Sequence, residues 1–312
     1  GSSHINCFKV TNAFDSVPSD AQVIYAEGFP ADRDLYDDTL AAEALKTAGN
    51  ADKVVIFAGL PDSFESEGYD RSHMRLPECQ NRLIAEILKV QPNAVIVLHN
   101  GSPVEMPWLS DVKGLLEAYL GGQAGGAAVA NILYGKVNPS GKLAETMPLK
   151  LADNPSYLNF GGGEKVEYRE GVFVGYRYYD TYDVAPAFPF GYGLSYTDFC
   201  LAGLTVKTAG DKEVEVSFHV SNIGDRAGAA VPQIYVSDKT PKVKKAQKEL
   251  KAFDKIYLEP GETKQITMRL HADAFSYYDV EQKAFVADAG TYAILLGKSA
   301  GEIVDVAEIE LK

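Results

Sequence analysis

Two short apolar runs place the strongest constraint on how this chain can fold. "KVVIFAGL" (residues 53–60) and "NAVIVLHNGSP" (93–103) are rich in β-branched residues and show no regular polar alternation. Runs of this kind are typical of strands that are buried on both faces of a parallel sheet. Parallel neighbours need a long crossover connection, which is usually a helix. We therefore expect a helix between these two strands.

The segments around the two runs supply the expected helices. "PECQNRLIAEILKVQP" (77–92) lies between two prolines and carries an apolar stripe at helical spacing. Two further helices are predicted in 37–53 and 125–142, and two further strands in "AQVIYAEG" (21–28) and 112–122. Alternation of strands and helices at this spacing predicts an α/β sandwich with a mostly parallel sheet.

The residue composition and periodicity of the sequence change after about residue 154. The segment up to Phe199 is dense in Tyr, Phe, Gly and Pro and has no helical period, so we expect an extended aromatic hairpin and loop. Beyond it, short alternating runs such as "KEVEVSFHVSN" (212–222) are separated by turn signals, which predicts a β-sandwich. We interpret the lysine-rich run 239–251 as a solvated loop or protected edge strand. The predicted domains are 1–199 and 200–312.

Charge and residue usage exclude several classes of function. The net charge of −13 argues against binding to nucleic acid or an anionic membrane, and no apolar run is long enough to span a bilayer. The three cysteines and five histidines are scattered, which gives no disulfide framework and no metal-ligand spacing. We expect no metal and no cofactor. With no visible signal peptide, a cytoplasmic location is favoured.

A loop with four charged residues follows the first apolar run. "FESEGYDR" (64–71) contains Glu65, Glu67, Asp70 and Arg71. Ligands of open parallel sheets bind beyond the carboxyl ends of the strands, where this loop begins. Glycoside hydrolysis uses two carboxyl groups, one of which protonates the leaving oxygen. Glu65 and Glu67 would point the same way on an extended loop, whereas a catalytic pair must flank a sugar from opposite faces. The alternative is a solvated acidic loop in which Asp70 pairs with Arg71.

Several stretches resemble the C-terminal half of family 3 glycoside hydrolases, the β-glucosidase family. They are "SEGYDRSHMRLP", "VIVLHNGSPVEMPWL", "GKVNPSGKL", "VFVGYRYYDT" and "FPFGYGLSYTDF", and they occur in consistent order along the chain. The start, "GSSHIN", resembles the entry to the second domain of that family. The tail from Leu201, with "YLEPGETKQITMRL" and "AGTYAILLG", resembles the fibronectin type III-like domain that closes many members.

The resemblance implies a role for each residue of the loop. Glu67 stands where the family has its general acid/base, in the context "S-E-G", and Glu65 is the runner-up. Asp70 and Arg71 are expected to hold the loop. Phe64 and Tyr69 are candidates for stacking on a sugar at the pocket rim, and the alternative for both is a packing role. The family's nucleophile is an Asp on a preceding (β/α)₈ barrel, for which these 312 residues leave no room.

The leading hypothesis is therefore the acid/base-bearing portion of a retaining, exo-acting β-glycosidase, most simply a β-glucosidase. The expected partners are the barrel and a β-glycoside substrate, and an oligomer is left open. As an isolated chain it is expected to be incomplete or inactive. A second hypothesis is a non-catalytic module that binds glycan or docks to proteins, suggested by the aromatic segment 168–199. A third is a self-sufficient hydrolase that uses both Glu65 and Glu67.

Overall fold

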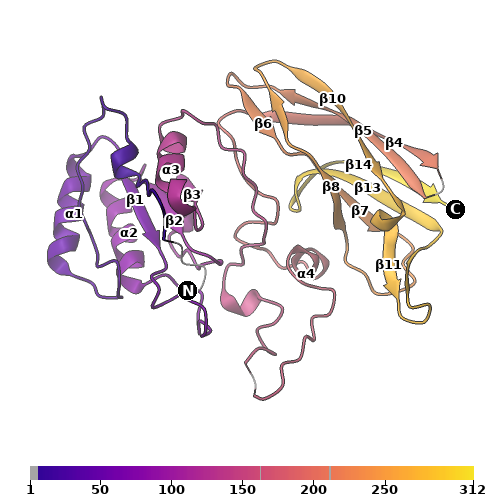
Figure 1. Ribbon diagram of the computed structural model, residues 1–312, viewed down its shortest axis with the longest axis horizontal. Coiled ribbons are helices and arrows are strands. Elements are labelled where there is room, and N and C mark those ends of the chain that lie inside the picture. The colour runs from indigo at the N-terminus through magenta and orange to yellow at the C-terminus, as the bar shows by residue number, and fades with distance from the viewer. Residues whose placement is uncertain (1–5, 162, 211) are drawn as a thin grey trace. The chain divides into compact units, whose positions relative to one another are not determined.

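The computed structural model describes residues 6–161, 163–210 and 212–312 (Figure 1). The start of the "GSSHIN" segment therefore lies outside the described residues. The chain forms two compact units: the residues up to Val137 with Leu149–Leu151, and Asn138–Pro148 with Ala152–Lys312. The domain boundary after residue 199 stays a prediction. Within the described ranges, no helix is both long and apolar enough to cross a membrane.

The first unit contains the predicted parallel sheet. Its strands are β1 (Val55–Gly59), β2 (Val95–His99) and β3 (Gly114–Glu117), in the order β1-β2-β3, with both pairs parallel. Ile96 and Val97 in the central strand are fully buried, as expected for a strand covered on both faces. The same prediction is wrong for β1, which lies at the edge of the sheet: Val55 and Phe57 are 39% and 41% exposed, and only the alternate residues are buried.

The helices of the first unit lie close to where the sequence predicts them. They are α1 (Asp38–Asn50), α2 (Glu78–Val90) and α3 (Gly125–Leu133), with short 3₁₀ turns at Phe14–Ser16, Leu109–Asp111, Gly122–Ala124 and, beginning in this unit, Leu151–Asp153. Helices α1 and α2 contact each other, and Figure 1 shows them on one side of the sheet. The Asp34 carboxylate accepts hydrogen bonds from the Glu78 and Cys79 amides, which caps the start of α2. The crossover between β1 and β2 is thus helical, as predicted.

The strand predicted at residues 21–28 is wrong. This segment has no strand assignment, and Val23, Ile24 and Tyr25 are 40%, 64% and 69% exposed. A strand exists only where another strand satisfies its backbone groups. Among the described residues none pairs with this segment, so its apolar pattern alone does not make it a strand.

The aromatic segment at the start of the second unit contains a short helix that the sequence analysis missed. Helix α4 (Tyr176–Thr181) begins after Gly175, whose φ of 53° suits glycine, and buries Tyr176 and Tyr179, which are three residues apart. The Tyr176 ring stacks on Phe190 at 4.6 Å and meets Tyr235 edge-on at 6.0 Å. These rings belong to the interior of the unit.

The rest of the second unit is the predicted β-sandwich. A four-stranded sheet has the order β14-β13-β7-β8 and a three-stranded sheet the order β10-β5-β4, with β6-β9 and β11-β12 as two-stranded ribbons. Their bounds are β4 (Phe199–Gly210), β5 (Glu213–Asn222), β6 (Gly228–Ala230), β7 (Gln233–Asp238), β8 (Glu249–Phe253), β9 (Ile256–Leu258), β10 (Thr263–Leu270), β11 (Ser276–Asp279), β12 (Ala284–Ala287), β13 (Gly290–Ser299) and β14 (Glu302–Leu311), with a 3₁₀ turn at Ala272–Phe275. The inward residues of β5, including Val214, Val216 and Phe218, are fully buried in one core.

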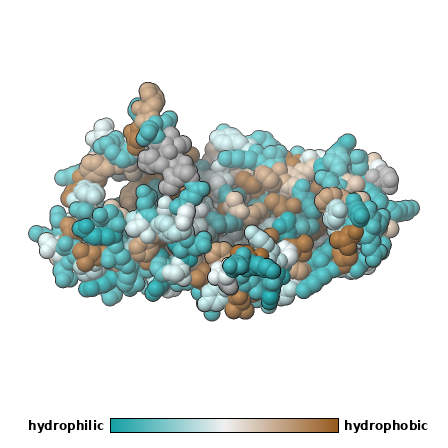
Figure 2. Space-filling view, turned by 60° about the horizontal axis from the view of Figure 1, so that its bottom comes forward, coloured by the Kyte–Doolittle hydropathy of each residue, from teal (hydrophilic) through white to brown (hydrophobic). Residues whose placement is uncertain are grey.

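The lysine-rich run is exposed over residues 239–244, as predicted, and becomes buried toward its end. It leads into β8, which lies at the edge of its sheet, as one of the two predicted interpretations requires. However, Lys245 pairs with Asp238 at 2.6 Å and Lys248 pairs with Asp180 at 2.7 Å, and all four side chains are largely buried. On the face shown in Figure 2, hydrophilic residues dominate and apolar residues lie among them in small groups. Lys245 and Lys248 therefore neutralise acids of the same unit.

Candidate functional site

The acidic loop begins where β1 ends. The Leu60 amide donates to the His99 carbonyl at 3.0 Å, which continues the parallel pairing one residue beyond the strand. A tight turn follows, because the amides of Phe64 and Glu65 both donate to the carbonyl of Pro61, at 2.8 and 3.1 Å. The loop thereby turns back over the carboxyl ends of β1 and β2. This is the edge of the sheet at which the sequence predicted a site.

Glu65 and Glu67 have different surroundings, although they are two residues apart. Glu65 is half-buried, and its carboxylate accepts a hydrogen bond from the Gly101 amide at 2.6 Å and another from the Ser102 hydroxyl at 2.5 Å. Glu67 is exposed. The loop is therefore not the extended strand in which two carboxylates point the same way. One acid binds a neighbouring turn, and the other is accessible to solvent.

Arg71 binds the same turn from the other end of the loop. Its Nη2 donates to the Ser102 hydroxyl at 2.7 Å and to the Pro103 carbonyl at 3.2 Å. Burial lowers the pKa of the Arg71 guanidinium, and the nearby Glu65 carboxylate opposes that shift. Asp70 is exposed. The guanidinium is therefore directed at the Ser102 side chain and the Pro103 carbonyl rather than at the neighbouring Asp70.

The two aromatic residues of the loop differ in accessibility. Phe64 is half-buried and meets the His73 ring edge-on at 5.8 Å. Tyr69 is 49% exposed, and its hydroxyl donates to the carbonyl of Asp62. The Tyr69 ring is thus held in place by its hydroxyl while part of its surface remains accessible. A sugar-stacking role stays a prediction for both residues.

Sequence reasoning missed two polar residues at the carboxyl ends of neighbouring strands, Asn100 just after β2 and Glu117 at the end of β3. Asn100 is fully buried, and its side-chain amide donates to the Ser102 carbonyl at 3.0 Å and to the Glu117 carboxylate at 3.3 Å. The other oxygen of Glu117 accepts from the Tyr119 amide at 2.9 Å. The available signal was a polar residue inside each of two predicted strand segments, Asn100 in 93–103 and Glu117 in 112–122. Parallel strands bring their carboxyl ends together, so the acidic loop rests on this cluster.

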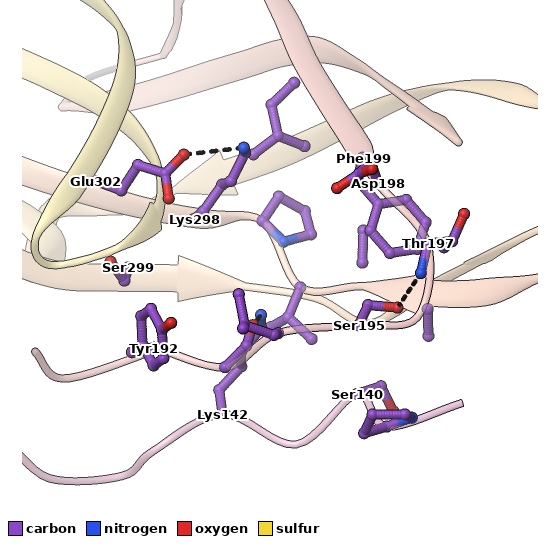
Figure 3. Close-up of a pocket in the computed structure, with 18 residues that line it drawn as sticks. Ser140, Lys142, Tyr192, Ser195, Thr197, Asp198, Phe199, Lys298, Ser299 and Glu302 are labelled. Carbon is purple, nitrogen blue, oxygen red and sulfur yellow. Dashed lines mark hydrogen bonds and ion pairs between the residues drawn. The ribbon is translucent and has the colours of Figure 1, made fainter. Parts of the chain in front are cut away.

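A separate cavity of about 140 Å³ lies in the second unit. Figure 3 shows Lys298 paired with Glu302 on one side of it and Ser195 beside Thr197 on another. The Lys142 ammonium donates to the carbonyl of Gly193, and burial lowers the pKa of Lys142. Both lysines are thus engaged by groups of the protein itself. We assign this cavity no part in catalysis.

Comparison with known families identifies both parts of the chain. The family model described as the glycosyl hydrolase family 3 C-terminal domain matches residues 2–196. The chain belongs to glycosyl hydrolase family 3. The model of the fibronectin type III-like domain matches residues 230–300, within the β-sandwich of this family 3 chain.

The relatives of this family 3 chain are longer enzymes. Thermostable β-glucosidase B of Acetivibrio thermocellus is 50% identical over 97% of this chain, which spans 41% of that protein. An exo-α-(1→6)-L-arabinopyranosidase of Bifidobacterium longum is 42% identical over 100% of this chain, which spans 42% of that protein. The crystal structure of a family 3 β-glucosidase from Bifidobacterium adolescentis superposes with a TM-score of 0.96 at 44% identity, covering 100% of this chain and 47% of that one. The chain thus spans less than half the length of these relatives and corresponds to their C-terminal part.

Proposed function

We propose that this chain is the acid/base-bearing portion of a retaining, exo-acting β-glycosidase, most simply a β-glucosidase. The observation that carries the proposal is the position of Glu67, which is exposed on a pinned loop beyond the carboxyl end of β1 in a family 3 chain. The similarity to proteins named β-glucosidases supports the reaction class. The chain spans less than half of those proteins, so the remaining machinery is proposed to lie on other polypeptide.

The proposed reaction has two steps and divides its groups between two domains. In the first step a carboxylate attacks the anomeric carbon while Glu67 donates its proton to the glycosidic oxygen, and the bond to the leaving group breaks. In the second step Glu67 takes a proton from water, which displaces the carboxylate and releases the sugar. The attacking Asp is proposed to come from a (β/α)₈ barrel domain or chain, the partner of this chain. The substrate is a β-glycoside.

The exposure of Glu67 supports the need for that partner. A general acid that works near neutral pH needs a carboxyl group shielded from water. Substrate and barrel together would cover Glu67 and supply this shielding. The residues that recognise the sugar are proposed to lie on the barrel. The named activities of the relatives, a β-glucosidase and an arabinopyranosidase, are consistent with a shared C-terminal part that does not itself fix the sugar.

The aromatic segment is divided with respect to the alternative of a glycan-binding module. Phe173, Tyr176 and Tyr179 are each at most 9% exposed, so these rings are not available as a binding platform. Tyr168, Tyr182 and Tyr196 are 82%, 47% and 42% exposed, so the glycan-binding alternative stays a prediction that rests on these three rings. We also retain a cytoplasmic location as part of the proposal.

The test is a set of kinetic measurements on the chain alone and on the chain joined to a family 3 barrel. We expect no turnover of an aryl β-glucoside by the chain alone and activity in the joined enzyme. Glu67→Gln is expected to lower the rate on an unactivated glucoside by about 10²–10⁴-fold, the usual contribution of general acid–base catalysis. Azide should restore turnover of an activated aryl glucoside, because azide attacks without needing a base.

Glu43→Gln is the matched control, because Glu43 is an exposed acid on the outer face of α1. It should leave the rate unchanged. Unchanged activity in Glu67→Gln, or sugar release by the unpartnered 312 residues, would disprove the assignment.

A further inference from the structure

The two ends of the acidic loop are fixed to one turn of the chain. Glu65 binds the amide of Gly101 and the hydroxyl of Ser102, and Arg71 binds the same hydroxyl and the carbonyl of Pro103. The Ser102 hydroxyl thus donates to the carboxylate and accepts from the guanidinium. We call this set of residues, Glu65, Arg71, Gly101 and Ser102, the loop clamp. It ties two residues six positions apart to a turn more than 30 residues away in sequence.

The turn that receives the loop is itself held firmly. Asn100 is fully buried, and its side chain donates to the Ser102 carbonyl, which fixes the turn to the end of β2. Gly101 permits the close approach of the carboxylate, because a Cβ there would lie 3.1 Å from one Glu65 oxygen and 3.3 Å from the other. An added side chain at residue 101 would require the Glu65 carboxylate to move by a few tenths of an ångström. The contact between Glu65 and the turn at Gly101 therefore depends on residues on both sides of it.

The clamp leaves a short segment between its two ends. Residues 66–70 connect Glu65 to Arg71, and four of these five, including Glu67, are exposed. Fixing both ends of so short a segment limits the positions that Glu67 can reach. Both carboxylate oxygens of Glu65 accept hydrogen bonds from groups within the chain, so this side chain is in use as an acceptor.

We infer that Glu65 is a positioning residue whose carboxylate, together with Arg71 and Ser102, holds the loop so that Glu67 is presented at the sheet edge. The clamp itself is independent of the reaction, whereas its effect on catalysis rests on the proposed function of Glu67. Precise placement of a catalytic group matters, because small displacements cost large factors in rate. Glu65 is thereby removed from the role of proton donor.

The clamp can be tested on the chain alone by hydrogen–deuterium exchange. The Gly101 amide donates to Glu65, so Glu65→Ala should speed its exchange by about tenfold or more, since hydrogen bonds to charged groups are the strong ones. Glu65→Gln, which keeps one acceptor oxygen, should give an intermediate rate. Glu43→Ala is the control and should leave Gly101 unaffected. An unchanged Gly101 rate in a folded Glu65→Ala chain would overturn the inference.

A second variant guards against misfolding of the first. Ser102→Ala removes the hydroxyl shared by Glu65 and Arg71, and Ser72→Ala changes an exposed serine nearby. Faster exchange across residues 62–72 in Ser102→Ala, with no change in Ser72→Ala, supports the clamp. Equal exchange in the two variants contradicts it. Circular dichroism of each variant establishes that the comparison is between folded chains.

Kinetic measurements on the chain joined to a family 3 barrel distinguish the roles of Glu65 and Glu67. Glu65→Ala should lower kcat by about 10–100-fold with little change in KM, azide should not restore it, and Glu65→Gln should recover part of the rate. Rescue of Glu65→Ala by azide would make Glu65 the acid/base and overturn the inference. If instead Glu67→Gln is fully active while the exchange results hold, the proposed role of Glu67 fails and the clamp stands.

Discussion

The ion pair between Lys248 and Asp180 gives a quantitative test of what holds the aromatic segment to the β-sandwich. The ammonium and carboxylate are 2.7 Å apart, and the two side chains are only 10% and 15% exposed. Burial raises the pKa of Asp180, and Lys248 opposes that shift. Lys248→Met keeps the apolar stem of the side chain and removes its charge. Asp180 then has no countercharge in its buried position.

The protonation of Asp180 limits how much stability Lys248→Met can lose. Without its partner, the carboxylate is expected to take up a proton in the folded state rather than stay ionised. Keeping a carboxyl group with an unfolded pKa of about 3.9 protonated at pH 7 costs about 4 kcal/mol, at about 1.36 kcal/mol per pH unit. At pH 5 the same limit is about 1.5 kcal/mol. We therefore expect Lys248→Met to lower the free energy of unfolding by about 3–4 kcal/mol at pH 7 and by no more than about 1.5 kcal/mol at pH 5.

The sign of the pH dependence follows from proton binding. In Lys248→Met the folded state keeps a proton on Asp180 that the unfolded state has released above about pH 4, so stability relative to the parent chain falls as pH rises from 5 to 7. Urea unfolding followed by far-ultraviolet circular dichroism at pH 5 and pH 7 measures this difference. Lys298→Met is the control, because its pair with Glu302 is 41% and 54% exposed and should contribute less than about 1 kcal/mol. An equal loss at both pH values would refute the reasoning.

Two further variants test the packing of the first unit. A Cβ at Gly59 would lie 2.0 Å from the His99 carbonyl oxygen, so Gly59→Ala should force β1 away from β2 and lower the free energy of unfolding by about 2–3 kcal/mol. Gly49→Ala is the control, because a Cβ there meets nothing within 4 Å, and it should not lower the melting temperature. Asn81→Ala removes the acceptor 3.0 Å from the buried indole N–H of Trp108 and should cost about 1–3 kcal/mol. Trp108 is the sole tryptophan, so its emission spectrum should change as well; an unaltered spectrum and stability would contradict this hydrogen bond.

The sequence predicted those parts of the fold in which local pattern and long-range packing agree. The run at 53–60 became β1 and the proline-bounded run at 77–92 became α2, because an apolar strand and an amphipathic helix each bury one surface against the other. The strands after Phe199 followed the same rule, with alternate residues such as Val214 and Val216 entering the core. Here the residue pattern already specifies which surface must be covered.

The parts that the sequence did not predict depend on partners far away in the chain. Residues 21–28 have the composition of a strand but no strand beside them among the described residues. Helix α4 has only six residues, too few to show a period, and it is stabilised by Phe190 and Tyr235 rather than by its own pattern. Similarly, Lys248 lies in a run of lysines that looks solvated, and only the fold brings Asp180 to it.

The two acids of the loop show where a motif stops being informative. Glu65 and Glu67 are both carboxylates beyond the end of β1, and composition cannot tell which is half-buried and which is exposed. The choice is made by the turn at Pro61, which directs Glu65 toward Gly101 and Ser102, and by Gly101, which has no side chain to obstruct it. Residue 67 then falls on the exposed part of the loop. If this division is correct, exchanging the two roles would require a change at residue 101 as well as in the loop. A bulkier residue at position 101 should therefore disturb Glu65 first and Glu67 only through it.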